Sequence, residues 1–207
     1  MAIYKNLKKA ILNPSDVSTL KIKINSERIP FEVFQFLNME SLYIQSNSLS
    51  KIDSKISKLI NLKTIYIHSN LLTTIPNELI TLKNLESLVL TDCRIRNFEL
   101  EVGCVSNLEN LMLNRNEIVN IPNSIYHMSS LKILGLSDNL ITHLTDEILN
   151  LTFLKKLSLD RNKLTQIPIK NIKRLENLHS LSLDGNNFSD ETKEKIQQEL
   201  NYWFGEL

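Results

Sequence analysis

Apolar residues recur along the chain with a period close to 23 residues. Residues 62–84 and residues 108–130 show the same pattern, position for position. The matching apolar positions are Leu62, Ile65, Ile67, Leu72, Ile75, Leu79 and Leu82 in the first segment, and Leu108, Leu111, Leu113, Ile118, Ile121, Ile125 and Met128 in the second. A repeat of this length indicates a solenoid, in which each unit buries its apolar edge only against its neighbours.

Each repeat predicts a strand, a turn and an irregular return. In the strand, side chains alternate, so the two Leu of each LxLx stretch point inward and the residues between them point outward. An inward Asn after the strand can hydrogen-bond backbone groups that the turn leaves unpaired. We expect such a ladder at Asn47, Asn70, Cys93, Asn116, Asn139, Asn162 and Asn186.

Written out, the pattern is LxxLxLxxNxLxx(I/L)PxxIxxLxx, and the chain resembles the leucine-rich repeat family over nearly its whole length. The resemblance implies an α/β solenoid with a curved parallel sheet on its concave side and irregular or short helical segments on its convex side. The Ile-Pro returns are similar to those of intracellular Ras-associated members and of many bacterial members. The family implies non-catalytic binding of a protein partner on the concave face, in a bacterial scaffold or in a protein that interacts with a host.

The ends of the chain depart from the repeat. Residues 1–16 predict a helix that caps the first coil, because Ile3, Leu7 and Ile11 have helical spacing. Membrane binding through the lysines of this segment is the alternative, and the short length favours a cap. Residues 17–188 hold one degenerate repeat and seven regular ones.

Residues 189–207 predict a second capping helix. Ser189 or Asp190 can act as its N-cap. Its buried stripe is expected at Ile196, Leu200, and either Trp203 or Phe204.

Composition excludes several classes of partner. The 207 residues carry a formal net charge of +1, which gives no general attraction to nucleic acid or to anionic membranes. We therefore expect a monomer that binds a protein, with no nucleic acid and no membrane partner. No signal peptide begins the sequence, so the cytoplasm is the default compartment, and export without a cleaved signal is the alternative.

Signatures of enzymes are absent from the sequence. The four histidines lie in different repeats, and no phosphate-binding loop or Gly-rich dinucleotide turn occurs. We predict no catalytic residue, no cofactor and no metal site. Cys93 takes a ladder position and should be buried and inert. Cys104 falls in the convex segment, so a disulfide between the two is not expected.

The outward strand positions form rows across the concave face. One row is Tyr43, Tyr66, Val89, Met112, Gly135, Ser158 and Ser182, and the next is Gln45, His68, Thr91, Asn114, Ser137, Asp160 and Asp184. Bulky apolar side chains fill the N-terminal part of the first row, and such residues are enriched at interface hot spots. The alternative is that they merely cover neighbouring strands. We predict a partner-binding site at Tyr43, Tyr66, His68, Val89, Met112, Asn114, Arg115 and Ile133.

A third row alternates in charge through Asp92, Arg115, Asp138 and Arg161. Strands about 4.8 Å apart bring opposite charges side by side, which favours a self-neutralising ladder over a polar anchor for a partner.

Two further functions stay open. A regulator of a small GTPase would need a positioned arginine, for which Arg94 and Arg96 are candidates. A receptor for a small ligand would need a closed pocket.

Overall fold

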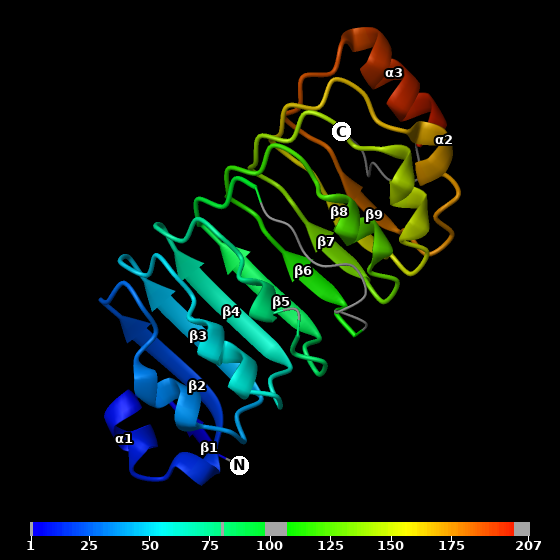
Figure 1. Ribbon diagram of the computed structural model, residues 1–207. Coiled ribbons are helices and arrows are strands. Elements are labelled where there is room, and N and C mark those ends of the chain that lie inside the picture. The colour runs from blue at the N-terminus through cyan, green and yellow to red at the C-terminus, as the bar shows by residue number, and fades with distance from the viewer. Residues whose placement is uncertain (1, 80, 98–106, 201–207) are drawn as a thin grey trace.

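The computed structural model describes residues 2–79, 81–97 and 107–200 (Figure 1). Within these residues, nine parallel strands form one sheet in which the order in space follows the order in the chain. The strands are β1 (Ala2–Tyr4), β2 (Val17–Ile24), β3 (Ser41–Ser46), β4 (Thr64–Ser69), β5 (Ser87–Thr91), β6 (Asn110–Met112), β7 (Ile133–Gly135), β8 (Lys156–Ser158) and β9 (Ser180–Ser182). The architecture is the predicted curved solenoid, with one strand in each coil.

Short helical segments return the chain along the side opposite the sheet, as Figure 1 shows. The α-helices are α1 (Leu7–Ile11), α2 (Ile169–Ile172) and α3 (Asp190–Glu199). Single 3₁₀ turns occur at Pro14–Asp16, Phe31–Gln35, Ser54–Lys58, Asn77–Leu79, Asn123–His127 and Asp146–Asn150. The core lies between the two sides, where inward residues such as Leu111, Leu134 and Leu157 are fully buried.

The N-terminal cap differs from the prediction. Residues 2–4 form a strand that pairs with β2, and the helix spans only Leu7–Ile11. Ile3 is 65% exposed, so the predicted buried helical stripe is wrong at this position, and Ala10 is the buried residue of α1. The reason is that β2 would otherwise present an unpaired backbone edge, which β1 satisfies.

At the other end, Ser189 is the N-cap of α3, because its side chain accepts a hydrogen bond from the backbone N–H of Thr192 at 3.2 Å. Ile196 and Leu200 are buried as predicted. Trp203 and Phe204 lie outside the described residues.

The Asn ladder is present only in the C-terminal half. The side chain of Asn139 donates to the carbonyl oxygens of Leu113 and Leu136 at 3.0 Å, and its Oδ1 accepts from the N–H of Ile118 at 3.0 Å. Asn116, Asn162 and Asn186 repeat this arrangement in their own coils. These four predictions are confirmed.

The predicted ladder positions Asn47 and Asn70 are wrong, because both side chains are exposed. Their place is taken by the preceding serines. The Ser46 hydroxyl accepts from the N–H of Leu49 at 2.9 Å, and the Ser69 hydroxyl donates to the carbonyl oxygen of Leu49 at 2.6 Å. In these two coils the alternation of the strand continues, so the serine points into the core.

A second Asn ladder, which the sequence pattern did not reveal, joins the coils just before β3, β4, β5, β6 and β9. Each of its side chains donates to a backbone carbonyl oxygen of the preceding coil at 2.8–2.9 Å. Its members are Asn38, Asn61, Asn84, Asn107 and Asn177.

Candidate partner-binding surface

The N-terminal part of the concave face holds a groove over β2, β3 and β4. The strand register aligns Lys21 with Tyr43 and Tyr43 with Tyr66, and one row further on it aligns Lys23 with Gln45 and His68. The groove has a volume of about 640 Å³ and is lined by Lys5, Lys21, Ile22, Lys23, Tyr43, Ile44, Gln45, Tyr66 and His68.

Two tyrosines form the floor of this groove. Their ring centroids lie 6.0 Å apart at an interplanar angle of 31°, and the Lys21 Nζ lies 4.5 Å from the centroid of the Tyr43 ring. Tyr66 is 37% exposed. Among the described residues, neither phenolic hydroxyl makes a hydrogen bond. The pair therefore offers rigid apolar area with two free polar groups at its rim, a combination that suits protein interfaces.

His68 lies at the edge of the groove and is held by Asp92. The distance between His68 Nδ1 and Asp92 Oδ2 is 2.9 Å. Arg115 also binds Asp92, through Nε and through Nη2, the latter at 2.7 Å. The hydrogen bonds from Arg115 lower the pKa of Asp92, against a smaller opposing effect of burial. Arg115 is thus occupied by an intramolecular pair and does not extend freely toward a partner.

The charge row forms pairs, as the sequence predicts. Arg161 binds Asp138 through Nε at 2.5 Å and Nη2 at 2.7 Å, and this lowers the pKa of Asp138. All four charged residues of the row have φ between 51° and 59°, in the left-handed region that L-residues seldom adopt. In the next coil, Gly185 occupies the same position with φ 68°, and a Cβ there would meet Arg161 Cγ at 2.9 Å.

Further along the face, the predicted binding residues turn out to cover their neighbours. A Cβ on Gly135 would lie 2.7 Å from the Met112 sulfur, so the Met112 side chain fills the space above that glycine. Asn114 Oδ1 accepts from the backbone N–H of Ser137 at 2.9 Å. For Met112 and Asn114, the alternative of covering adjacent strands therefore describes the geometry better than a free binding surface.

Of the two other predicted positions, Val89 is next to the groove and Ile133 is not. Val89 aligns with Tyr66 in β5 and is half-buried. Ile133 begins β7, where it aligns with Asn110 and Lys156, and lies apart from the tyrosine row.

The sequence did not predict the lysines of the groove. Lys21 and Lys23 occupy in β2 the positions that Tyr43 and Gln45 occupy in β3, so strand alignment of the degenerate repeat could have found them. Lys5 could not be placed, because β1 pairs in parallel with β2 only in the folded chain.

Comparison with known proteins agrees with the fold. A family model described as leucine rich repeat matches residues 38–95. A leucine-rich repeat protein from Leptospira interrogans is 27% identical with a TM-score of 0.63, over 99% of this chain and 63% of that one. The chain has the fold of a leucine-rich repeat protein. A search of curated protein sequences finds no match.

Other solved leucine-rich repeat structures are similar as well. An internalin from Listeria monocytogenes is 21% identical with a TM-score of 0.69, over 98% of this chain and 58% of that one. The ectodomain of a plant membrane receptor kinase from Arabidopsis thaliana, solved in complex with CASPARIAN STRIP INTEGRITY FACTOR 2, is 26% identical with a TM-score of 0.68. That match covers 84% of this chain and 22% of the receptor. This leucine-rich repeat chain thus spans about three fifths or less of the three solved chains.

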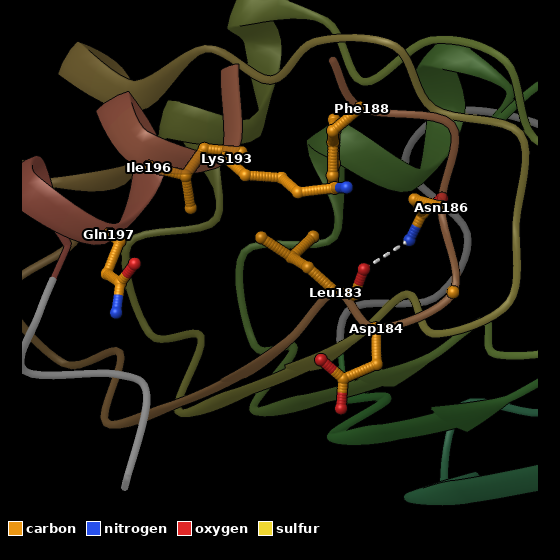
Figure 2. A pocket seen from close by; sticks show the side chains of 8 residues that line it. Leu183, Asp184, Asn186, Phe188, Lys193, Ile196 and Gln197 are labelled. Atoms are coloured by element: carbon orange, nitrogen blue, oxygen red, sulfur yellow. Dashed lines mark hydrogen bonds between the residues drawn. The ribbon is translucent and has the colours of Figure 1, made fainter. Parts of the chain in front are cut away.

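A second cavity, of about 300 Å³, lies where α3 packs on the last leucine-rich coil (Figure 2). Its apolar wall includes Leu183, Phe188 and Ile196, which belong to the packing of the coil against the helix. Asn186 faces it, but the side chain of Asn186 already donates to the carbonyl oxygen of Leu183 at 2.7 Å. Asp184, Lys193 and Gln197 also line the cavity.

The remaining candidates for chemistry are unremarkable in the described part of the chain. Cys93 is buried, and burial raises the pKa of its thiol to about 11. Cys104 lies outside the described residues. Arg94 and Arg96 are exposed, and within residues 2–79, 81–97 and 107–200 no hydrogen bond orients either guanidinium. Those same residues contain no cluster of metal-ligating side chains and no helix long and apolar enough to cross a bilayer.

Proposed function

We propose that this chain binds a protein partner through the groove over β2, β3 and β4, without catalysing a reaction. The observation that carries the proposal is the Tyr43–Tyr66 pair, whose tilted rings contact one another on the floor of a groove of about 640 Å³. An accessible aromatic pair stabilises a solvent-facing sheet less than it can stabilise a protein interface.

The fold supports this proposal. Leucine-rich repeat solenoids are general protein-interaction modules, and one similar structure is a receptor ectodomain in complex with a protein factor. Two settings fit the role, namely a bacterial scaffold and a protein that interacts with a host. Regulation of a small GTPase is not favoured by any observation, because neither Arg94 nor Arg96 is positioned by a neighbour.

The test is affinity purification followed by calorimetry with the partner that it identifies. Losing a well-buried aromatic anchor typically costs about 2 kcal/mol, which corresponds to roughly a thirtyfold weaker affinity. We expect Tyr66→Ala to weaken binding by at least that factor, with an unchanged circular dichroism spectrum.

Ser158→Ala is the matched control, because Ser158 occupies the same row in β8, and it should bind as the wild type does. A partner that binds both variants equally, or that protects only the convex side from proteolysis, would contradict the proposal.

A further inference from the structure

Two rows of the concave face, the one that contains Tyr43 and the one that contains Gln45, carry charge only at their ends. In β2 they present Lys21 and Lys23, and just after β8 and β9 they present Asp160 and Asp184. Between these ends the rows contain no Asp, Glu, Lys or Arg. With strands about 4.8 Å apart, the two ends are separated by about 30 Å.

The lysines at the N-terminal end have no carboxylate partner. Among the described residues, Lys5, Lys21 and Lys23 form no ion pair, and no carboxylate lines their groove. On the rim of the same sheet the pattern is different, because Lys132 binds Glu109 at 2.6 Å and Lys63 lies 3.5 Å from Glu40. The groove therefore holds an excess of positive charge that the chain itself leaves uncompensated.

Of the two aspartates at the far end, Asp160 is engaged within the chain. Asp160 accepts hydrogen bonds from the Ser137 hydroxyl at 3.2 Å and from the backbone N–H of Asp184 at 3.0 Å. Asp160 and Asp184 would repel an acidic ligand that extended along the whole face.

We propose that the groove over β2, β3 and β4 binds an acidic segment of the protein partner. Carboxylates of the segment lie over Lys21 and Lys23, and an adjacent apolar or aromatic side chain contacts Tyr43 and Tyr66. This inference rests on the proposed function and adds the chemistry of the partner. The position of Lys21 and Lys23 in β2 directs the acidic end of the segment toward that strand.

The shape of the site favours a peptide segment over other anions. A bilayer surface is flat over tens of ångströms and contacts the inner side of a curved sheet poorly. A nucleic acid would need a continuous basic track, whereas the positive charge here ends after β2 and is followed by two tyrosines. A short peptide with a run of carboxylates next to apolar side chains matches both the lysines and the tyrosines of the groove.

The experiment uses a fluorescein-labelled peptide in which a run of Glu is followed by alternating Leu and Phe, measured by fluorescence anisotropy with the full chain. A second peptide replaces each Glu with Lys. The test variant is Lys21→Glu with Lys23→Glu. Its matched control is Lys58→Glu with Lys83→Glu, two exposed lysines outside the groove that make the same change in net charge.

We expect the acidic peptide to bind the wild type, and to bind the test variant about tenfold or more weakly at low salt. The lysine peptide should show the reverse preference, and the control variant should behave as the wild type. Raising the ionic strength to about 1 M should weaken the acidic complex, because the Debye length then falls to roughly 3 Å.

Several outcomes would overturn the inference. It fails if neither peptide binds, if both bind equally, or if the control variant loses as much affinity as the test variant. Binding of phosphatidylserine vesicles or of an oligonucleotide in preference to the acidic peptide would also refute it. If Tyr66→Ala abolishes binding while Lys21→Glu with Lys23→Glu leaves it unchanged, the proposed function stands and the acidic chemistry does not.

Discussion

The N-terminal and C-terminal coils of this protein share one repeat pattern but close their strands in two different ways. In β3 and β4, six residues are paired and the last one is an inward serine. In β6, β7 and β8, only three residues are paired, and a residue with positive φ then directs an asparagine inward. The change occurs at β5, where Asp92 has φ 57° and Cys93 takes the inward position.

The residue two places after the second inward strand position accounts for the difference. Strand alternation would point this residue into the core. Ile24, Ser46 and Ser69 can be buried there, and the strand simply continues. Asp or Arg at this position cannot be buried without a large desolvation cost, so the backbone instead takes a left-handed conformation costing about 1–2 kcal/mol, and the following Asn enters the core.

This difference also divides the concave face by its shape. Long, evenly paired strands carry two outward rows in register and form the open groove of Lys21, Tyr43 and Tyr66. In the short-strand coils, the outward side chains turn onto their neighbours, as Met112 does above Gly135. The strand-end residue thus influences which outward side chains stand over open surface and which lie on their neighbours.

The largest effect that tests the comparison is loss of a ladder asparagine. Asn116→Ala should lower the free energy of unfolding by about 1–3 kcal/mol, because the N–H of Ile95 and the carbonyl oxygen of Leu90 lose a buried partner. Asn70→Ala, at the equivalent but exposed N-terminal position, should change it by less than about 0.5 kcal/mol. Urea denaturation measures both, and equal losses would show that the two halves do not differ in this way.

A smaller change in stability is expected when glycine replaces the residue at the end of the strand. Ser69→Gly should destabilise by about 1–2 kcal/mol, since Ser69 is extended and its hydroxyl donates to Leu49. Arg115→Gly should be nearly neutral, because relief of the left-handed conformation offsets the loss of the exposed pair with Asp92. A cost for Arg115→Gly at least as large as that for Ser69→Gly would remove the physical basis of the comparison.

The smallest effect concerns pH. Arg161 lowers the pKa of Asp138 in the folded chain, so this carboxylate stabilises the fold above its unfolded value of 3.8, and the contribution is lost as pH falls through the lowered pKa. Asp138→Asn should therefore be slightly less stable than the wild type at pH 7, with the difference vanishing in strong acid. Thermal melts across this pH range provide the measurement. A difference that persists unchanged at low pH would assign the effect to packing instead.

Much of the candidate site could be predicted from the sequence, and the rest could not for identifiable reasons. The alignment of repeats places Tyr43, Tyr66 and His68 on one face, because strand periodicity is a local property. It also places Met112 in the same row. In the folded chain, however, the Met112 side chain fills the space that the missing side chain of Gly135 leaves in the next coil, so Met112 is not free to contact a partner. Contacts between coils join residues 23 apart, and a pattern within one repeat does not contain them.

By itself, the sequence determined the solenoid, the single strand per coil, the inward leucines and the alternating charge row, because these follow from the period and from side-chain polarity. Only the tertiary structure decided that Asn47 and Asn70 stay outside, that β1 pairs with β2, and that Lys5 reaches the groove. Those outcomes depend on competition between burying a residue and bending the backbone, and on unpaired edges that exist only once the coils have stacked.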